Sequence, residues 1–251
     1  MNLTARAGVV FIILVSCSVG RSQQYLSGSE IPDMTRVLPP APVSGDARDT
    51  RDRDIFRATR SLQGSPRWML AQSDVDWHTP ALMKSFSCAL GVAPDPAKTP
   101  RLAALLTEVS TESNAIVNRV KDIYKRQRPF HVDEGPICAP AEGFDYPSGH
   151  STIGFATGLI LTELEPDRAT ELLARGRAFG ESRVVCGVHN ASAVEAGRVE
   201  AAAFVAALHG SPAFRRDIEA ARNELDAFRK GSAPKPQACD IESGLTASSP
   251  Y

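Results

Sequence analysis

Apolar positions recur every three or four residues along most of the chain, which is the spacing of helices with one buried face. The longest stripe starts after Thr99 and Pro100, a residue suited to cap a helix followed by one suited to its first turn. We expect this helix to continue until Pro129. Further helices are predicted over 52–63, 80–90, 151–164, 167–185, 192–208 and 211–229. Alternating strand patterns are scarce, so the fold class is all-α, a single-domain helical bundle.

The two ends of the chain differ from this helical middle. Residues 8–20 are apolar between Arg6 and Arg21, too short to span a bilayer but typical of a signal peptide. We therefore predict a signal peptide over 1–20 and a periplasmic or secreted protein, although 14–17 also resembles a lipobox that would place a lipid anchor on Cys17. Residues 21–45 are predicted to form an extended arm, 46–230 the helical domain and 231–251 a C-terminal tail.

Charge and cysteine content narrow the choice of function. The 251 residues carry 28 basic and 29 acidic side chains, a balance that argues against a nucleic-acid partner or a polybasic membrane-surface protein. Beyond Cys17 there are four cysteines, Cys88, Cys138, Cys186 and Cys239, which could form two disulfides in an oxidising compartment. Three pairings are open. No C-x-x-C pair is present, and we expect no metal and no cofactor.

Two local patterns offer groups that could bind an anion. Lys121 and Arg128 are seven residues apart near the end of the long predicted helix, almost two turns, so both cations should point the same way. Alternatively, these cations simply face solvent at the end of the helix, where positive charge is favourable. In Pro147-Ser148-Gly149-His150, the Ser offers a hydroxyl, the Gly permits close backbone approach, and a helix is expected to start there.

A third pattern links Arg183 to His189. An uninterrupted helix would place these side chains about 120° apart, but Gly187 can end the helix and turn His189 back toward Arg183. Ser192-x-x-Glu195 then has the form of a capping box for the next helix. A core His within a helix-turn-helix is the alternative. Taken together, however, two His, three cations and an anion-binding turn suit the binding and attack of a tetrahedral oxyanion.

The three patterns resemble a known signature. Lys121-x6-Arg128-Pro129, Pro147-Ser148-Gly149-His150 and Ser182-Arg183-x5-His189, in this order, are similar to the motifs of the bacterial class A non-specific acid phosphatases. These belong to the type 2 phosphatidic acid phosphatase and vanadium haloperoxidase superfamily, whose helical bundle the resemblance implies. The similarity extends from about residue 25 to 229 and includes 64–68. It implies a secreted, metal-independent phosphatase acting on small phosphate monoesters.

The resemblance also assigns roles. Lys121, Arg128 and Arg183, with Ser148 and the Gly149 N–H, would bind the phosphoryl oxygens. His189 would attack phosphorus and form a phosphohistidine, and His150 would protonate the leaving oxygen and later activate water. A His acid with a pKa near 6.5 would favour turnover on the acidic side.

One position departs from the family pattern. The family continues His-x-x-x-Asp, and its Asp orients the nucleophilic His, whereas this chain has Ala193. Glu195 is the nearest carboxylate that could take over, although its capping role competes; a backbone carbonyl could also hold the His. On this basis Ala193→Asp should raise turnover. Two alternatives stay open: a catalytically weakened phosphate-binding protein and a vanadate-dependent haloperoxidase. The chain could also form a homo-oligomer.

Overall fold

The computed structural model describes residues 24–231 and 233–251, so the predicted signal peptide and Cys17 lie outside the described residues. The all-α prediction is confirmed, since the described residues form helices and no strand. The helices are α1 Met34–Val37, α2 Ala47–Thr59, α3 Pro66–Ser73, α4 Thr79–Ser85, α5 Ser87–Leu90, α6 Pro100–Tyr124, α7 Gly149–Leu164, α8 Ala169–Val185, α9 Ala191–Leu208, α10 Pro212–Lys230 and α11 Cys239–Thr246.

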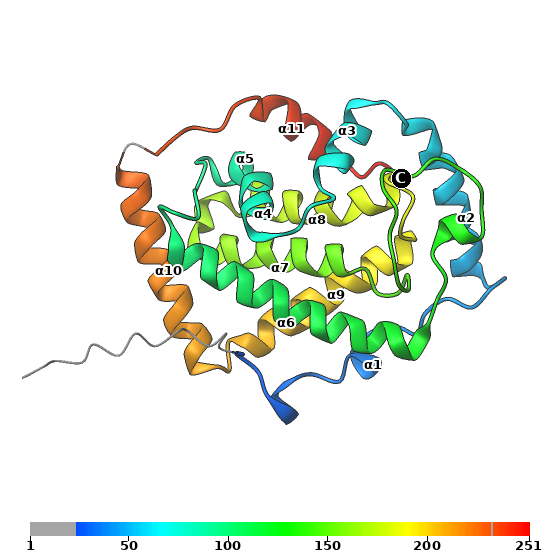
Figure 1. The fold of residues 1–251 in the computed structure, drawn as a ribbon, viewed down its shortest axis with the longest axis horizontal. Helices are drawn as coiled ribbons and strands as arrows, with labels where there is room; N and C mark the ends of the chain where they lie inside the picture. The colour runs from blue at the N-terminus through cyan, green and yellow to red at the C-terminus, as the bar shows by residue number, and fades with distance from the viewer. Residues whose placement is uncertain (1–23, 232) are drawn as a thin grey trace, which may run out of the picture.

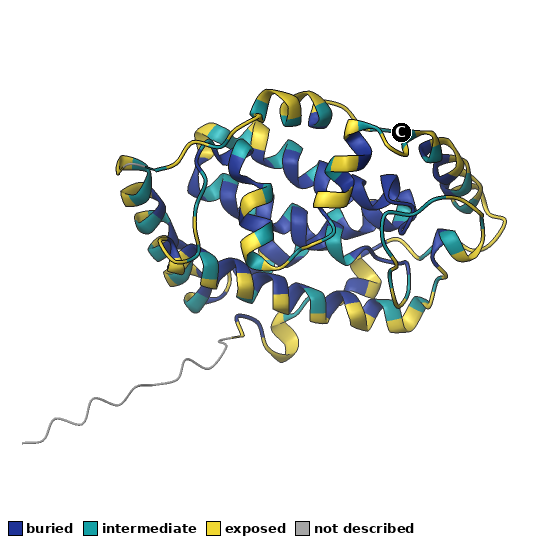
Figure 2. Cartoon of the chain, turned by 45° about the horizontal axis from the view of Figure 1, so that its top comes forward, coloured by how far each residue is buried: buried dark blue, intermediate teal, exposed yellow. Residues whose placement is uncertain are grey.

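The bundle is built around α7. This helix contacts α6, α8, α9 and α10, while α2 lies at the opposite end of the molecule from α10 (Figure 1). Buried residues concentrate on α7 and α8, and the helices around them expose their outer faces (Figure 2). A Cβ added at Gly176 would lie 3.0 Å from the Gly154 carbonyl oxygen, so the two central helices pack with almost no side chain between them. This close contact fixes where the ends of α7 and α8 lie.

The long helix α6 ends earlier than its sequence pattern predicts. It stops at Tyr124 because Lys125 adopts the left-handed conformation with φ 48°. Arg128 follows in extended backbone with φ −71°. The prediction that Lys121 and Arg128 share one helix face is therefore wrong, and any joint role must come from the way the chain after Lys125 folds back.

The start of α9 also differs from the prediction. The helix begins at Ala191 after Asn190, and no side chain caps it. Ser192 instead hydrogen-bonds Asp52 of α2 through its backbone N–H, at 2.8 Å, and through its hydroxyl. Glu195 pairs with Arg198 on the same helix. The predicted capping box does not form, because Asp52 competes for the Ser192 side chain.

Both ends of the described chain are attached to the bundle. The backbone N–H groups of Tyr25 and Leu26 donate to the carboxylate of Glu112 on α6, at 3.0 and 2.8 Å. At the other end Cys239 forms a disulfide with Cys88, and α11 packs against α5 and α8. The predicted tail is thus held by a helix as well as by its cysteine. The second disulfide joins Cys138 to Cys186. The four cysteines thus adopt one of the three pairings that the sequence left open.

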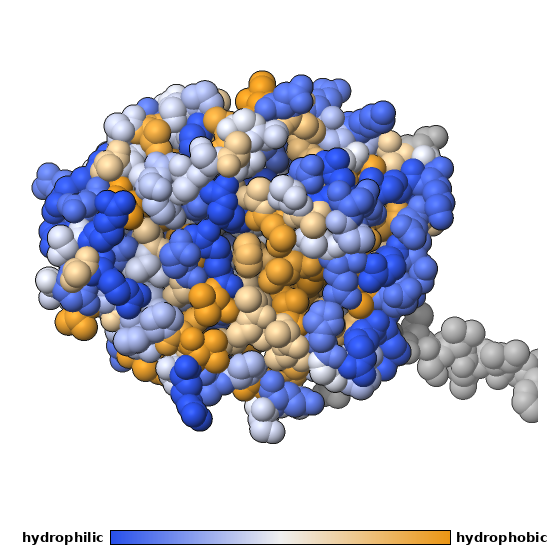
Figure 3. Space-filling model, turned by 180° about the vertical axis from the view of Figure 1, so that it is seen from behind, coloured by the Kyte–Doolittle hydropathy of each residue, from blue (hydrophilic) through white to orange (hydrophobic). Residues whose placement is uncertain are grey.

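The surface of the bundle is mostly hydrophilic. Seen from behind, it carries an apolar area near its centre that is bordered by hydrophilic residues (Figure 3). None of the helices in the described part of the chain is long and apolar enough to cross a membrane. Homo-oligomer formation stays a prediction.

Candidate active site

The groups singled out from the sequence gather where α6 and α8 end and α7 and α9 begin. The starts of α7 and α9 lie against each other, because Ser148 N–H donates to the Ala193 carbonyl at 2.9 Å and Ser151 Oγ donates to the Val194 carbonyl at 2.7 Å. Backbone N–H groups in the first turn of a helix have no partner within it, and they give that end a partial positive charge. Two helix starts side by side therefore favour an anion here.

His189 is turned back toward Arg183 by the residue predicted to do so. Gly187 has φ 74°, and the backbone N–H groups of Val188 and His189 both donate to the Arg183 carbonyl, at 3.0 and 3.3 Å. A Cβ at Gly187 would collide with the guanidinium of Arg60. Arg60 donates to the carbonyls of Val184 and Val185, at 2.7 and 2.9 Å, and so satisfies the end of α8.

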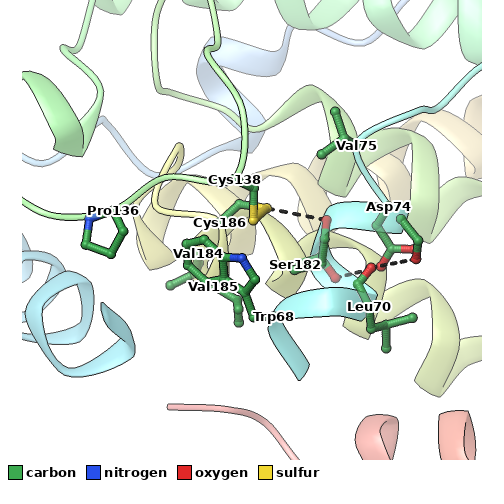
Figure 4. The surroundings of a disulfide bond; sticks show 12 residues. Trp68, Leu70, Asp74, Val75, Pro136, Cys138, Ser182, Val184, Val185 and Cys186 are labelled. Carbon is green, nitrogen blue, oxygen red and sulfur yellow. Dashed lines mark hydrogen bonds between the residues drawn. A yellow bond between two sulfur atoms is a disulfide. The ribbon is translucent and has the colours of Figure 1, made fainter. Parts of the chain in front are cut away.

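A disulfide fixes the loop opposite this turn. Cys186 follows the last residue of α8 and is bonded to Cys138 in the long connection between α6 and α7, and Cys138 N–H also donates to the Cys186 carbonyl at 3.0 Å. Trp68 and Val185 pack around it, and Ser182 hydrogen-bonds Asp74 nearby (Figure 4). The turn that carries His189 is thereby tied to the loop that leads to α7.

Arg128 contacts the Nε2 edge of the His189 ring. Its Nη1 donates to the Val188 carbonyl at 2.7 Å and lies 2.9 Å from His189 Nε2, while Nε and Nη2 donate to the carbonyls of Glu142 and Gly143. A guanidinium can only donate, so Nε2 must accept and carries no proton. Burial, followed by the charges of Arg128, Lys121 and Arg183, lowers the pKa of His189 well below its ordinary value. His189 is therefore a neutral imidazole with its lone pair on Nε2.

The other nitrogen of His189 has a carboxylate partner that the sequence reasoning missed. His189 Nδ1 lies 3.0 Å from Asp145 Oδ1, and Asp145 is fully buried. Burial raises the pKa of Asp145, whereas Arg126 and Asn190 favour its charged form. Asp145 lies only two residues before the Pro147 motif, but 44 residues separate it from His189, and no periodicity links them. Glu195, the nearest carboxylate that the sequence offered for this role, is 61% exposed and paired with Arg198, so it does not take over.

Arg183 brings a second guanidinium to the same place. The residue is only 3% exposed, yet its Nε and Nη1 have no hydrogen-bond partner among the described residues. Burial, and then the charge of Arg128, lowers its pKa to about 10. Lys121 belongs to the same group, since burial followed by Arg128 lowers its pKa to about 8. Leaving buried cationic donors unpaired is costly, so a site of this kind is suited to an anion.

His150 lies within electrostatic range of these cations, and a hydrogen bond to the backbone defines its tautomer. Its Nε2 is 2.9 Å from the Val75 carbonyl, which can only accept, so Nε2 carries the proton and the neutral ring has its lone pair on Nδ1. The ring stacks on Phe179 and meets the edge of Trp77. Burial, followed by the charge of Arg183, lowers the pKa of His150 well below its ordinary value. This lowered pKa disfavours the protonated form of His150 in the free protein, whereas the acid role expected from the sequence needs that form.

Ser148 and Gly149 complete the group at the start of α7. Ser148 is fully buried and caps the helix by accepting from Ser151 N–H at 3.4 Å, so its own hydroxyl proton is left to donate elsewhere. Gly149 is the first residue of α7, where the N–H has no partner within the helix. Every residue proposed from the sequence thus lies at this end of the bundle.

Comparisons with known proteins identify the family of this chain. The PAP2 superfamily matches residues 102–217, which span α6 to the first part of α10. An acid phosphatase of Zymomonas mobilis is 43% identical over 84% of this chain and 82% of its own length. Non-specific acid phosphatases of Salmonella typhimurium and Providencia stuartii are 34% and 32% identical, over 81% and 82% of this chain. These findings confirm the resemblance inferred from the motifs. The chain belongs to the PAP2 superfamily and, within it, to the bacterial non-specific acid phosphatases, and it is an acid phosphatase.

Proposed function

We propose that this acid phosphatase hydrolyses small phosphate monoesters through a phosphohistidine on His189, without a metal ion. The observation that carries the proposal is the Arg183 guanidinium, which is buried with two nitrogens unpaired among the described residues. Its charge acts on His189, whose Nε2 is unprotonated. A phosphoryl group supplies the oxygens that such donors need and the phosphorus that such a nitrogen can attack.

Charge supports a phosphate dianion as the ligand. Lys121, Arg128 and Arg183 influence the pKa of His189 through their charges, so all three lie within electrostatic range of it. Arg128 Nη1 now donates to His189 Nε2, and this bond must pass to a phosphoryl oxygen for Nε2 to reach phosphorus. The first-turn N–H of Gly149 and the Ser148 hydroxyl are further donors for the oxygens on which charge is spread in the transition state.

The chemical steps follow from the two tautomers. The lone pair on His189 Nε2 forms a bond to phosphorus while the bond to the ester oxygen breaks, and His150 gives a proton to the departing oxygen. Water then attacks phosphorus, returns a proton to His150, and the phosphorus–nitrogen bond breaks. Burial and Arg183 disfavour a proton on His150 in the free protein, so we expect His150 to take up its proton as the dianion binds, since a neighbouring negative charge raises its pKa. Turnover should therefore be best at acidic pH.

Export is part of the same proposal. Two disulfides, Cys88–Cys239 and Cys138–Cys186, favour an oxidising compartment such as the periplasm or the exterior of the cell. The alternative of a catalytically weakened phosphate-binding protein rested on Ala193, which leaves His189 without the family's orienting Asp. Asp145 supplies a carboxylate to His189 instead, so this argument for weakened catalysis no longer applies. No three His, Cys, Asp or Glu side chains are grouped as a metal site in the described residues.

The test is hydrolysis of p-nitrophenyl phosphate together with trapping of the phosphoenzyme. The wild-type protein should keep its activity in EDTA, form an acid-labile and alkali-stable phosphoenzyme, and be inhibited competitively by vanadate. His189→Ala should lose both activity and labelling. His209→Ala is the matched control, because His209 is 44% exposed and pairs with Glu163. Activity that survives in His189→Ala, or that is abolished by EDTA and restored by zinc or magnesium, would refute the proposal.

A further inference from the structure

We infer that Asp145 is the positioning carboxylate for His189, supplied by the loop before α7 in place of the helix position now occupied by Ala193. This inference rests on the proposed function of His189. It assigns to Asp145 the task of holding the tautomer that leaves Nε2 free to attack, and of balancing the charge of the ring once Nε2 carries a phosphoryl group.

The hydrogen bonds of Asp145 suit an ionised carboxylate. Oδ1 accepts from His189 Nδ1 and from the backbone N–H of Asn190, both at 3.0 Å. Oδ2 accepts from Asn190 Nδ2 at 2.9 Å and from Arg126 Nη1 at 3.2 Å. Each oxygen thus receives two donors, which uses the acceptor capacity of the group and leaves no lone pair for a proton. His189 Nδ1 must therefore be the protonated nitrogen of the ring.

The backbone and a second set of carboxylates hold Asp145 in place. Its N–H donates to the Arg126 carbonyl at 2.8 Å, so the segment after α6 and the segment before α7 are joined at this residue. The Arg126 side chain also pairs with Asp49 at 3.0 Å and Asp52 at 2.9 Å, both on α2. Arg126 is thereby fixed from both sides, and rigid support of this kind is what a positioning residue requires.

The surroundings of Ala193 are unsuited to a carboxylate. Ala193 is fully buried and packs in a small apolar cluster with Tyr146 and Ala196. An Asp there would bury a second negative charge among these side chains without a free donor on His189, whose Nδ1 is already bound to Asp145. Ala193→Asp should therefore fail to raise turnover, which reverses the expectation drawn from the sequence.

The experiment compares Asp145→Asn with Asp133→Asn. Both substitutions remove a largely buried carboxylate that pairs with arginine, but Asp133 pairs with Arg53 and Arg57, whereas Asp145 contacts His189. In Asp145→Asn, we expect kcat on p-nitrophenyl phosphate to fall by about 10²- to 10⁴-fold, because loss of such a carboxylate disturbs the tautomer. KM should change by less than about threefold, since the cations that bind phosphate remain. Asp133→Asn should keep kcat within about threefold of wild type.

Nitrogen-15 NMR of the wild-type imidazoles provides a second measurement that does not depend on how the variants fold. His189 should show a protonated Nδ1 and an unprotonated Nε2 in the free enzyme. A protonated Nε2, a kcat for Asp145→Asn within threefold of wild type, or an equal loss in Asp133→Asn would overturn the inference. Failure of the proposed function is a different result, because His189→Ala would then keep its activity whatever Asp145 does.

Discussion

Glu200 on α9 gives a stability prediction whose size can be worked out from its surroundings. The residue is fully buried, its Oε2 is 3.5 Å from Thr152 Oγ1, and its Oε1 has no partner among the described residues. Burial raises its pKa from 4.5 to about 8, against the opposing influence of Thr152 and Lys121. The folded protein therefore keeps this carboxyl protonated at neutral pH, where the unfolded chain has lost the proton.

The sign and magnitude of the pH dependence of unfolding follow from this difference in proton binding. Between pH 4.5 and about 8 the folded state binds a proton that the unfolded state does not, so the free energy of unfolding falls as pH rises through this window. One pKa unit corresponds to about 1.4 kcal/mol, so the whole shift corresponds to at most about 5 kcal/mol. Glu200→Gln removes the titration at nearly constant volume. Relative to wild type, the variant should gain stability progressively from pH 5 to pH 8.5, by several kcal/mol.

The assay is urea denaturation of both proteins at pH 5, 6.5 and 8.5 with the disulfides intact. His150 and His189, whose pKa values are lowered by burial, destabilise both proteins below pH 6.5, and their effect cancels in the comparison. The amide of Gln adds a constant offset of about 1 kcal/mol that does not vary with pH. A difference between the two proteins that stays the same from pH 5 to pH 8.5 would refute the reasoning.

Two further predictions concern the turn that carries His189 and the proposed phosphate-binding residue Lys121. Gly187→Ala forces a side chain into the left-handed region and against Arg60, so the free energy of unfolding should fall by about 2 kcal/mol or more; an unchanged Tm would contradict this. Lys121, whose pKa is lowered to about 8, should lose its charge as pH rises above 8, so KM should rise about tenfold by pH 9. Lys121→Arg keeps its charge there and should show a flatter rise; an equally steep rise in this variant would assign the titration to another group.

Local sequence rules predicted most of the helices and the turn that carries His189. Apolar periodicity and the Thr-Pro and Ser-Pro starts predicted α6 and α10, because these signals act within a few residues of one another. Gly187 was identified for the same reason, since only a residue tolerant of positive φ can end α8 and reverse the chain within two residues. The motifs likewise identified the cations and both His, since their order along the chain is itself the signal.

Contacts between distant segments were decided only by the tertiary structure. The sequence predicted a continuous helix through Arg128, whereas the left-handed Lys125 releases Arg128 from α6 and brings its guanidinium onto His189. The carboxylate on His189 comes from Asp145, 44 residues away, because the close start-to-start packing of α7 and α9 brings the two chain segments together. The sequence alone determined which chemical groups are present and how each segment folds locally. The hydrogen bonds between these groups depend on how the helices pack across the bundle, and no pattern within one helix encodes that geometry.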